Sequence, residues 1–251
     1  MKIITILTEK GGVGKTTSSI HLGAALAEKK KKVLLIDFDP QMNLSKGYQI
    51  PNNFEYNVKD LLHSNFNNIS FFQKNKYLFV LKGNRYLEVE KYNLKSLLIN
   101  LKLINQQVNF DYVIIDCPPR PITPDSLGNI ALSCSDYVIS PIESEIYSIE
   151  GINSLLPSIE LIKRTNNQNL RFLGFFFNKA EQNTTLFKKY RKMAFEQAEG
   201  LVFQTFLRKD VTVEKAKELG TTVYQVNKNS RISKDYSNFV KEMLNKIKEN
   251  E

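Results

Sequence analysis

The side chains best suited to chemistry lie near the start of the chain, in the run Lys10-Gly11-Gly12-Val13-Gly14-Lys15-Thr16-Thr17. Glycines let the backbone curl so that successive N–H groups point at phosphate oxygens, and a following helix adds partial positive charge at its N-terminus. In such a loop Lys15 reaches the β and γ phosphates of a nucleotide, and the Thr16 hydroxyl binds Mg²⁺. A glycine-rich turn without a ligand is the alternative. The glycine spacing, the lysine, the threonine and the flanking patterns together favour a phosphate-binding loop over residues 10–17.

Three aspartates follow two further apolar runs. Asp37 and Asp39 come directly after VLLI, and Asp116 ends YVIID. In open α/β sheets, ligands bind outside the carboxyl ends of the strands, which is where these carboxylates would lie. Phosphoryl transfer needs such groups to hold hydrated Mg²⁺ and to orient an attacking water. One aspartate at a strand end would indicate only a cap or a turn, but three behind a phosphate loop predict a magnesium site.

The elements that must position these residues alternate between strand and helix. Near-continuous apolar runs are typical of parallel strands whose two faces are both covered by helices. We therefore expect a doubly wound α/β fold with a mostly parallel sheet, and loops with short helices over 41–76. The predicted strands cover 3–8, 32–37, 112–116, 137–141, 170–177 and 201–207, and the predicted helices cover 16–27, 123–132, 148–164, 184–199, 213–219 and 234–248.

Composition excludes several classes of protein. The 251 residues are 42% hydrophobic and 24% charged, which is enough to build a core and excludes a disordered chain. No run approaches the roughly 20 apolar residues that span a bilayer, and no signal-peptide pattern is present, so we expect a cytoplasmic protein. Cys117 and Cys134 are isolated, which predicts buried thiols rather than a disulfide framework or an iron–sulfur site.

The phosphate loop departs from the common pattern at one informative position. Glu9 stands where G-x-x-x-x-G-K-[ST] has its first glycine, and a second lysine, Lys10, precedes the glycines. In this the chain resembles the deviant Walker A ATPases, which include ParA partition proteins, MinD and the nitrogenase iron protein. The runs D-F-D-P-Q-M-N at 37–43 and D-C-P-P at 116–119 resemble ParA more closely than MinD.

This resemblance implies cofactors and residue roles. It implies hydrolysis of ATP to ADP and phosphate with Mg²⁺, in one P-loop ATPase domain over residues 1–251 with no helix-turn-helix domain before it. Lys10 would reach across a dimer interface to the partner's nucleotide, and Asp39 would position the attacking water. The implied catalytic residues are Lys10, Lys15 and Asp39, the implied magnesium-binding residues are Thr16, Asp37 and Asp116, and Asn178 is the implied reader of adenine.

The resemblance also implies partners. A ParA-like ATPase dimerises on ATP binding, binds DNA nonspecifically on the nucleoid, and hydrolyses ATP when a ParB-like centromere-binding protein stimulates it. A MinD-like ATPase that cycles on membranes is the alternative, since the apolar positions of 239–247 share one helical face. A nucleotide-dependent scaffold without turnover is a third possibility. The chain departs from the family at Arg120, which follows the two prolines, and at Leu207-Arg208, where relatives often have Pro-Arg.

Basic residues are concentrated in the last two fifths of the chain. Residues 1–150 hold 17 Lys and Arg against 15 Asp and Glu, whereas residues 151–251 hold 18 against 11. Contacts from such residues to DNA phosphates give affinity without sequence readout, although a solvated face is the simpler interpretation. The predicted DNA-binding residues are Lys188, Lys189, Arg191, Lys192, Arg208, Lys209, Lys228, Arg231 and Lys234.

Overall fold

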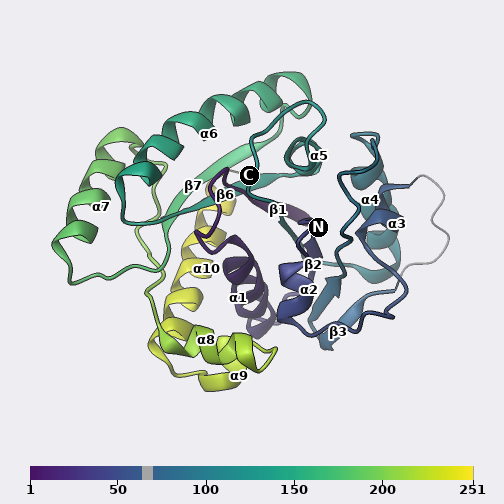
Figure 1. Ribbon diagram of the computed structural model, residues 1–251, viewed down its shortest axis with the longest axis horizontal. Helices are drawn as coiled ribbons and strands as arrows, with labels where there is room; N and C mark the ends of the chain where they lie inside the picture. The colour runs from purple at the N-terminus through teal and green to yellow at the C-terminus, as the bar shows by residue number, and fades with distance from the viewer. Residues whose placement is uncertain (64–69, 251) are drawn as a thin grey trace.

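A seven-stranded sheet forms the centre of the molecule in the computed structural model, which describes residues 1–63 and 70–250. The strand order is β3-β4-β2-β5-β1-β6-β7, and every neighbouring pair is parallel except β3 with β4 (Figure 1). The strands are β1 (Lys2–Ile6), β2 (Val33–Asp37), β3 (Phe72–Asn75), β4 (Leu78–Leu81), β5 (Tyr112–Asp116), β6 (Tyr137–Ile142) and β7 (Arg171–Phe177). The doubly wound, mostly parallel α/β fold is therefore confirmed.

Helices cover both faces of the sheet, which is why the central strands are apolar along their whole length. All residues of β2 and β6 are buried. One buried cluster joins the sheet to α1 (Lys15–Glu28), α2 (Asn43–Gly47), α8 (Val211–Glu218), α9 (Val223–Asn227) and α10 (Arg231–Glu249). The other joins it to α3 (Val58–Leu62), α4 (Ser96–Val108), α5 (Leu127–Cys134), α6 (Ile146–Thr165) and α7 (Thr185–Gln197).

The last helix packs on the core through its apolar face. Phe239 is fully buried, and its ring centroid lies 4.7 Å from that of Phe176 on β7 and 4.6 Å from that of Phe203. Val240, Met243 and Ile247 are buried on the same face. This face is therefore occupied by the protein's own core, as expected for a packing helix rather than an interfacial one. Within the described ranges, no helix combines the length and apolarity that crossing a bilayer requires.

Several predicted elements differ from those in the structure. Residues 201–207 form no strand, because they bond to β7 only in places: the Phe203 amide donates to Phe175 O at 2.8 Å, and the Leu207 amide to Phe177 O at 2.8 Å. The helix expected from residue 123 begins at Leu127, because the Ser126 hydroxyl caps it by accepting from the Asn129 amide. In 41–76 the short helices α2 and α3 are confirmed, but β3 was not expected there. No prediction from the sequence covers β4, α4 or α9. Cys117 and Cys134 are buried free thiols, as expected.

Candidate functional site

The loop between β1 and α1 has the backbone shape that a phosphate-binding loop requires. Gly12 and Gly14 adopt φ of 81° and 85°, in the left-handed region that favours glycine. A Cβ on Gly14 would lie 2.2 Å from Nδ2 of Asn178, so no larger residue fits there. Gly14 is the N-cap of α1 and offers no side chain to the first N–H groups of the helix. Those groups are thus suited to bind an anion.

Lys15 lies folded over this loop. Its side chain is largely buried, with the residue 6% exposed, and its Nζ donates to Lys10 O at 3.0 Å. Burial lowers the pKa of Lys15 below its ordinary value, while the carboxylates of Asp116 and Asp39 act in the opposite direction. A lysine in this position can reach phosphate oxygens by exchanging its bond to the loop for one to the ligand.

Asp37 and Asp116 end neighbouring strands in direct register beneath the loop. Their Cα atoms are partners in the pairing of β2 with β5, and both side chains are fully buried. Asp37 Oδ2 accepts from the amide and hydroxyl of Ser45 at 2.8 and 2.6 Å, and Asp116 Oδ1 accepts from the Ser19 hydroxyl at 2.9 Å. Asp37 Oδ1 and Asp116 Oδ2 are buried without a hydrogen-bond partner.

The Asp37–Asp116 pair is suited to bind a cation. Burial is the main reason that the pKa of Asp37 is raised to about 6. Burial, together with the charge of Asp37 and against a hydrogen bond from Thr16, raises the pKa of Asp116 to about 7. Two buried carboxylates with unpaired oxygens, beside the Thr16 hydroxyl, match the hard oxygen ligands that Mg²⁺ prefers. The residues present therefore fit a hydrated magnesium ion.

A cavity of about 570 Å³ extends from the loop toward α8, a size suited to a nucleotide. Asp39, which is 6% exposed, lines it, and its Oδ1 accepts from the Gln41 amide at 2.9 Å. Among the predicted residues, the cavity brings together Gly12, Gly14, Lys15, Thr16, Thr17 and Asp39; its other walls come from Ile20, His21, Asn43, Lys46, Gly47, Pro119, Val213, Glu214, Lys217 and Thr221.

The side chain of Lys10 does not line this cavity and points toward Glu145, at the start of α6. Its Nζ forms an ion pair with Glu145, and both side chains are partly exposed, at 38% and 40%. Gly11 and Val13 also lie on the loop without lining the cavity, and Gly11 faces Pro119. The ammonium of Lys10 is thus paired with Glu145 outside the cavity lining, at the rim of the site.

Asn178 and Lys179 brace the loop from β7. Asn178 Nδ2 donates to Val13 O at 2.8 Å, and Lys179 Nζ donates to Gly12 O at 2.6 Å and pairs with Glu143 at 2.8 Å. The amide nitrogen of Asn178 is therefore engaged by the loop, and its role as an adenine reader stays a prediction. The sequence pattern predicts no role for Lys179, Ser19 or Ser45. For Lys179 its place directly after Asn178 was the available signal.

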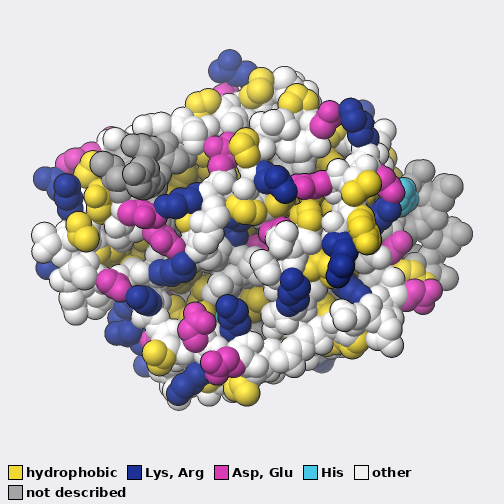
Figure 2. All heavy atoms as spheres, viewed as in Figure 1, with side chains coloured by type: hydrophobic (Ala, Val, Ile, Leu, Met, Phe, Trp, Pro, Cys, Tyr) yellow, Lys and Arg dark blue, Asp and Glu magenta, His cyan; other side chains and the backbone are white. Residues whose placement is uncertain are grey.

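The predicted DNA-binding residues divide into two groups, on α7 and around the start of α10. On the face drawn in Figure 2, Lys and Arg side chains are interspersed with Asp and Glu rather than gathered into one block. On α7, Arg191 lies 4.8 Å from the centroid of the Phe195 ring and also donates to Gln204, whereas Lys192 pairs with Glu196. Lys188 and Lys189 of the same helix have no ion pair within the described part of the chain.

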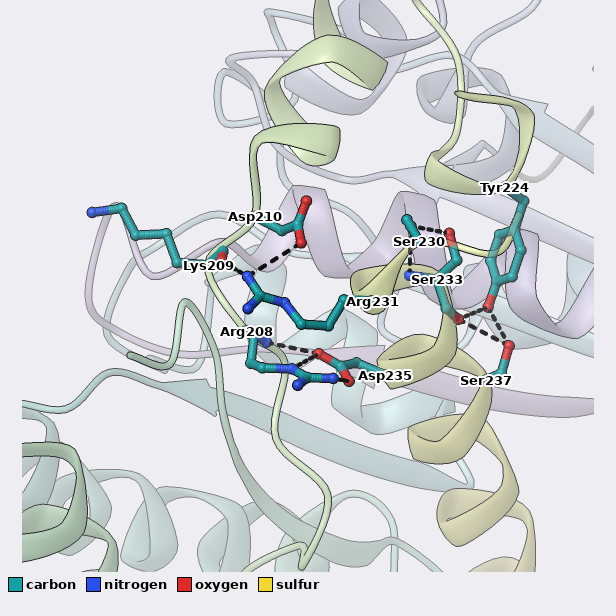
Figure 3. Close-up of polar contacts among 9 residues, drawn as sticks. All are labelled: Arg208, Lys209, Asp210, Tyr224, Ser230, Arg231, Ser233, Asp235 and Ser237. Carbon is teal, nitrogen blue, oxygen red and sulfur yellow. Dashed lines mark hydrogen bonds and ion pairs between the residues drawn. The ribbon is translucent and has the colours of Figure 1, made fainter. Parts of the chain in front are cut away.

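The second group is largely paired, as Figure 3 shows for Arg208 and Arg231. Arg208 binds Asp235 through its backbone amide and guanidinium, with the Nε to Oδ2 distance at 2.8 Å, and its side chain is only 22% exposed. Arg231 contacts Asp210 at 3.4 Å and Lys209 O at 3.3 Å. Lys228 pairs with Glu28, and Lys209 with Glu181. Arg208 is thus bound to α10 and is not available to DNA. Within residues 1–63 and 70–250, Lys234 has no ion pair.

The raised pKa of the buried Asp116 carboxyl leads to a prediction about the stability of the protein when this charge is removed. Asp116→Asn is expected to raise the free energy of unfolding at pH 8 without Mg²⁺, on the order of 1–2 kcal/mol. The folded wild type binds a proton at Asp116 with a pKa of about 7, whereas the ordinary value is 3.8, so its stability falls as the pH rises from 5 to 8. The variant lacks this loss. Urea unfolding at both pH values measures the difference.

The control is Asp125→Asn, whose side chain is 74% exposed, and which should leave stability unchanged at both pH values. A loss of stability in Asp116→Asn at pH 8 would contradict the interpretation that the charge is costly in the absence of a cation.

Comparisons with known proteins agree with this geometry. A family model described as an AAA domain matches residues 1–172. The sporulation initiation inhibitor protein Soj of Bacillus subtilis is 33% identical over 253 residues, covering 96% of this chain and 98% of the relative. The chromosome-partitioning ATPase Soj of Treponema pallidum is 30% identical over 253 residues, covering 97% of each.

Solved structures show the same fold. A plasmid partition protein from Borrelia burgdorferi has a TM-score of 0.71 at 24% identity, covering 98% of each chain. Cobyrinic acid a,c-diamide synthase from Mycobacterium smegmatis, solved with an ATP analog and magnesium, has a TM-score of 0.80 at 23% identity, covering 97% of this chain and 94% of that one.

Proposed function

This chain belongs to the ParA/Soj family of partition ATPases, and we propose that ATP binding closes two copies into a dimer that holds DNA without sequence preference. Hydrolysis, stimulated by a ParB-like centromere-binding partner, then releases the DNA. The observation that carries this proposal is the glycine loop with Lys15 folded over it, above the buried Asp37–Asp116 pair.

Each part of the site has a role in this cycle. The loop amides and Lys15 bind the phosphates of ATP. Thr16, Asp37 and Asp116 would hold Mg²⁺, which would supply positive charge beside the transferred phosphoryl group. Asp39, at the wall of the cavity, orients the water that attacks the γ phosphorus. The bond to the β–γ bridging oxygen breaks, and ADP and phosphate leave.

Lys10 is proposed to act on the partner subunit's nucleotide. Its position at the rim, on Glu145 and outside its own cavity lining, supports this role. A second cation supplied in trans makes turnover depend on dimerisation. The exchange of Glu145 for phosphate oxygens would accompany closure of the dimer.

The dimer would present two copies of each of two basic groups, one made by Lys188 and Lys189 on α7 and the other by Lys234 on α10. Phosphate contacts from such lysines give affinity without reading sequence, and two copies add avidity. The other predicted residues have intramolecular contacts that make them weaker candidates, namely Arg191, Lys192, Lys209, Lys228 and Arg231.

The proposal is tested by DNA binding. Lys188→Gln with Lys189→Gln is expected to weaken binding of the ATP-loaded protein to random duplex DNA. It should also reduce the steepness of the plot of log affinity against log salt by about 4 for the dimer, one unit for each of the four lost contacts. Fluorescence anisotropy across a salt series measures both quantities, with Lys95→Gln plus Lys102→Gln, two exposed lysines at α4, as the matched control. An unchanged slope would remove α7 from the DNA surface.

A membrane-cycling role of the MinD kind is the second candidate. The burial of Phe239, Val240, Met243 and Ile247 in the core disfavours α10 as its membrane anchor. The same anisotropy series with vesicles of anionic lipid separates the two roles. ATP-dependent binding to vesicles but not to DNA would favour the membrane role over the proposed one.

A further inference from the structure

Two side chains from the turn after β7 hold consecutive carbonyl oxygens of the phosphate loop. Asn178 Nδ2 donates to Val13 O at 2.8 Å, and Lys179 Nζ donates to Gly12 O at 2.6 Å. A Cβ on Gly14 would lie 2.2 Å from Asn178 Nδ2 and 3.9 Å from Lys179 Cε. The two side chains therefore fill the space directly beside this part of the loop.

The bonds to these carbonyls fix the direction of the next two backbone amides. In a trans peptide, the C=O of one residue and the N–H of the next point in opposite directions. Because the carbonyls of Gly12 and Val13 point toward the turn after β7, the N–H groups of Val13 and Gly14 point away from it. Among the described residues, none accepts a hydrogen bond from either N–H group. Two adjacent unpaired amides in a glycine loop form part of an anion-binding concavity.

The turn that carries the two side chains is itself anchored to the sheet. The Asn178 backbone amide donates to the carbonyl oxygen of Ile142, the last residue of β6, at 2.8 Å. Lys179 Nζ pairs with Glu143, the residue after β6, at 2.8 Å. Asn178 is also buried, with 5% of the residue exposed. The phosphate loop is therefore held from a fixed support rather than from a free surface side chain.

The backbone of Lys179 adopts a conformation that is unfavourable for a lysine. Its φ of 50° lies in the left-handed region, where a side chain costs free energy and glycine does not. Such conformations persist where the surrounding structure determines them, and they cluster at ligand-binding sites. The bonds of the Lys179 ammonium to Gly12 O and Glu143 give a reason for a lysine at this position.

We propose that Asn178 and Lys179 are positioning residues that hold the phosphate loop in its anion-binding shape before a nucleotide binds. They act on the phosphates through the amides of Val13 and Gly14, and not on the base. For Asn178 this is an alternative to reading adenine, and the two roles lead to different results below. The proposal rests on the proposed function in one respect, which is that the loop of residues 10–17 binds nucleotide phosphates.

Competition for a ribose-labelled fluorescent ADP, with unlabelled ADP and tripolyphosphate in the presence of Mg²⁺, tests the proposal. Tripolyphosphate has the phosphates of a nucleotide but no base. Asn178→Ala should weaken both ligands by the same factor, about 3- to 10-fold, the range for one neutral hydrogen bond. Because this variant removes no charge, such a loss does not come from a missing cation.

Three variants separate the side chain of Lys179 from its backbone. Lys179→Met keeps the stem without the donor, and should weaken ADP and tripolyphosphate about 10-fold, the low end for a charged donor, because the side chain is half-exposed. Lys179→Gly lacks the same donor but suits a φ of 50°, so it should weaken both ligands without lowering the midpoint of urea unfolding. Lys179→Arg keeps a charged donor and should recover part of the affinity.

Lys163→Met is the matched control. Lys163 is a partly exposed lysine of α6 that pairs with Glu160 at 4.0 Å. Its replacement removes a glutamate-paired charge that does not contact the phosphate loop. The affinities for ADP and tripolyphosphate should therefore equal those of the wild type.

The outcomes separate this proposal from the one on which it rests. If Asn178→Ala weakens ADP and leaves tripolyphosphate unchanged, Asn178 reads the base and the positioning proposal is wrong. Unchanged affinities in either Asn178→Ala or Lys179→Met would also overturn it, as would a failure of tripolyphosphate to compete on the wild type, because the loop would then not be formed in advance. In all these cases ADP still binds the wild type and the proposed function stands. If ADP does not bind the wild type, the phosphate-loop assignment fails, and both proposals fail with it.

Discussion

Lys10→Ala is expected to lower the rate of phosphate release at saturating ATP by about 10³- to 10⁵-fold, the range for a cation supplied in trans to a transferring phosphoryl group. Lys10 pairs with Glu145 at the rim and does not line its own subunit's cavity. ATP affinity of the single subunit should therefore change less than about threefold. Phosphate release with DNA present, and equilibrium binding of a fluorescent ATP analogue, measure the two quantities.

A mixing experiment shows whether Lys10 acts across the dimer. In a mixed dimer of Lys10→Ala and Asp39→Ala subunits, the first keeps its own Asp39 and receives Lys10 from the second. One of the two sites is then complete. Equal amounts of the two inactive proteins, mixed before ATP is added, should recover about one quarter of wild-type turnover, since half of the dimers are mixed and each has one working site.

The control is Lys102→Ala, which should leave turnover unchanged. Lys102 is an exposed lysine on α4, in the helical layer that does not contain α1. Wild-type turnover in Lys10→Ala would contradict the assignment of Lys10 to catalysis. Failure of the mixture to recover activity would instead show that Lys10 acts within its own subunit.

The centre of the fold could be predicted because its signals are local. β1, β2 and β5 are short apolar runs that end in the loop or in an aspartate, and the structure contains all three within one or two residues of the predicted bounds. The edges of the sheet depend on contacts between distant segments. β3 has alternating burial and pairs antiparallel with β4, which no periodicity in the Asn-rich segment indicated. Residues 201–207 read as a strand but lie alongside β7 with too few bonds to form a ladder.

The candidate site shows the same division between local and long-range signals. Strand-end aspartates follow from the rule on parallel sheets, and the register of Asp37 with Asp116 agrees with it. Their partners Ser45 and Ser19 have no signature of their own, and Ser19 is 97 residues from Asp116 in sequence. Likewise, a count of basic residues cannot distinguish exposed Lys188 from Arg208, because the acid that binds Arg208 lies 27 residues away on α10.

Asp39→Ala is expected to lower the rate of ATP hydrolysis by about 10²- to 10⁴-fold, the usual contribution of a positioned general base or water-orienting group. ATP binding should be retained, because Asp39 is neither one of the strand-end pair nor part of the loop. Since release from DNA requires hydrolysis in the proposed cycle, the variant loaded with ATP should remain dimeric and bound to DNA. Single-turnover phosphate release, light scattering and the DNA dissociation rate measure these effects.

The contrast with Asp116→Asn makes this prediction specific. Asp116 has an unpaired buried oxygen suited to Mg²⁺, so its replacement should weaken Mg²⁺-dependent ATP binding as well as turnover, whereas Asp39→Ala should affect turnover alone. Asp125→Ala, at an exposed carboxylate paired with Lys91, should change neither. Normal hydrolysis in Asp39→Ala would move the water-orienting role to another residue of the cavity wall. Loss of ATP binding would instead mean that Asp39 belongs with the residues that hold the nucleotide and its cation.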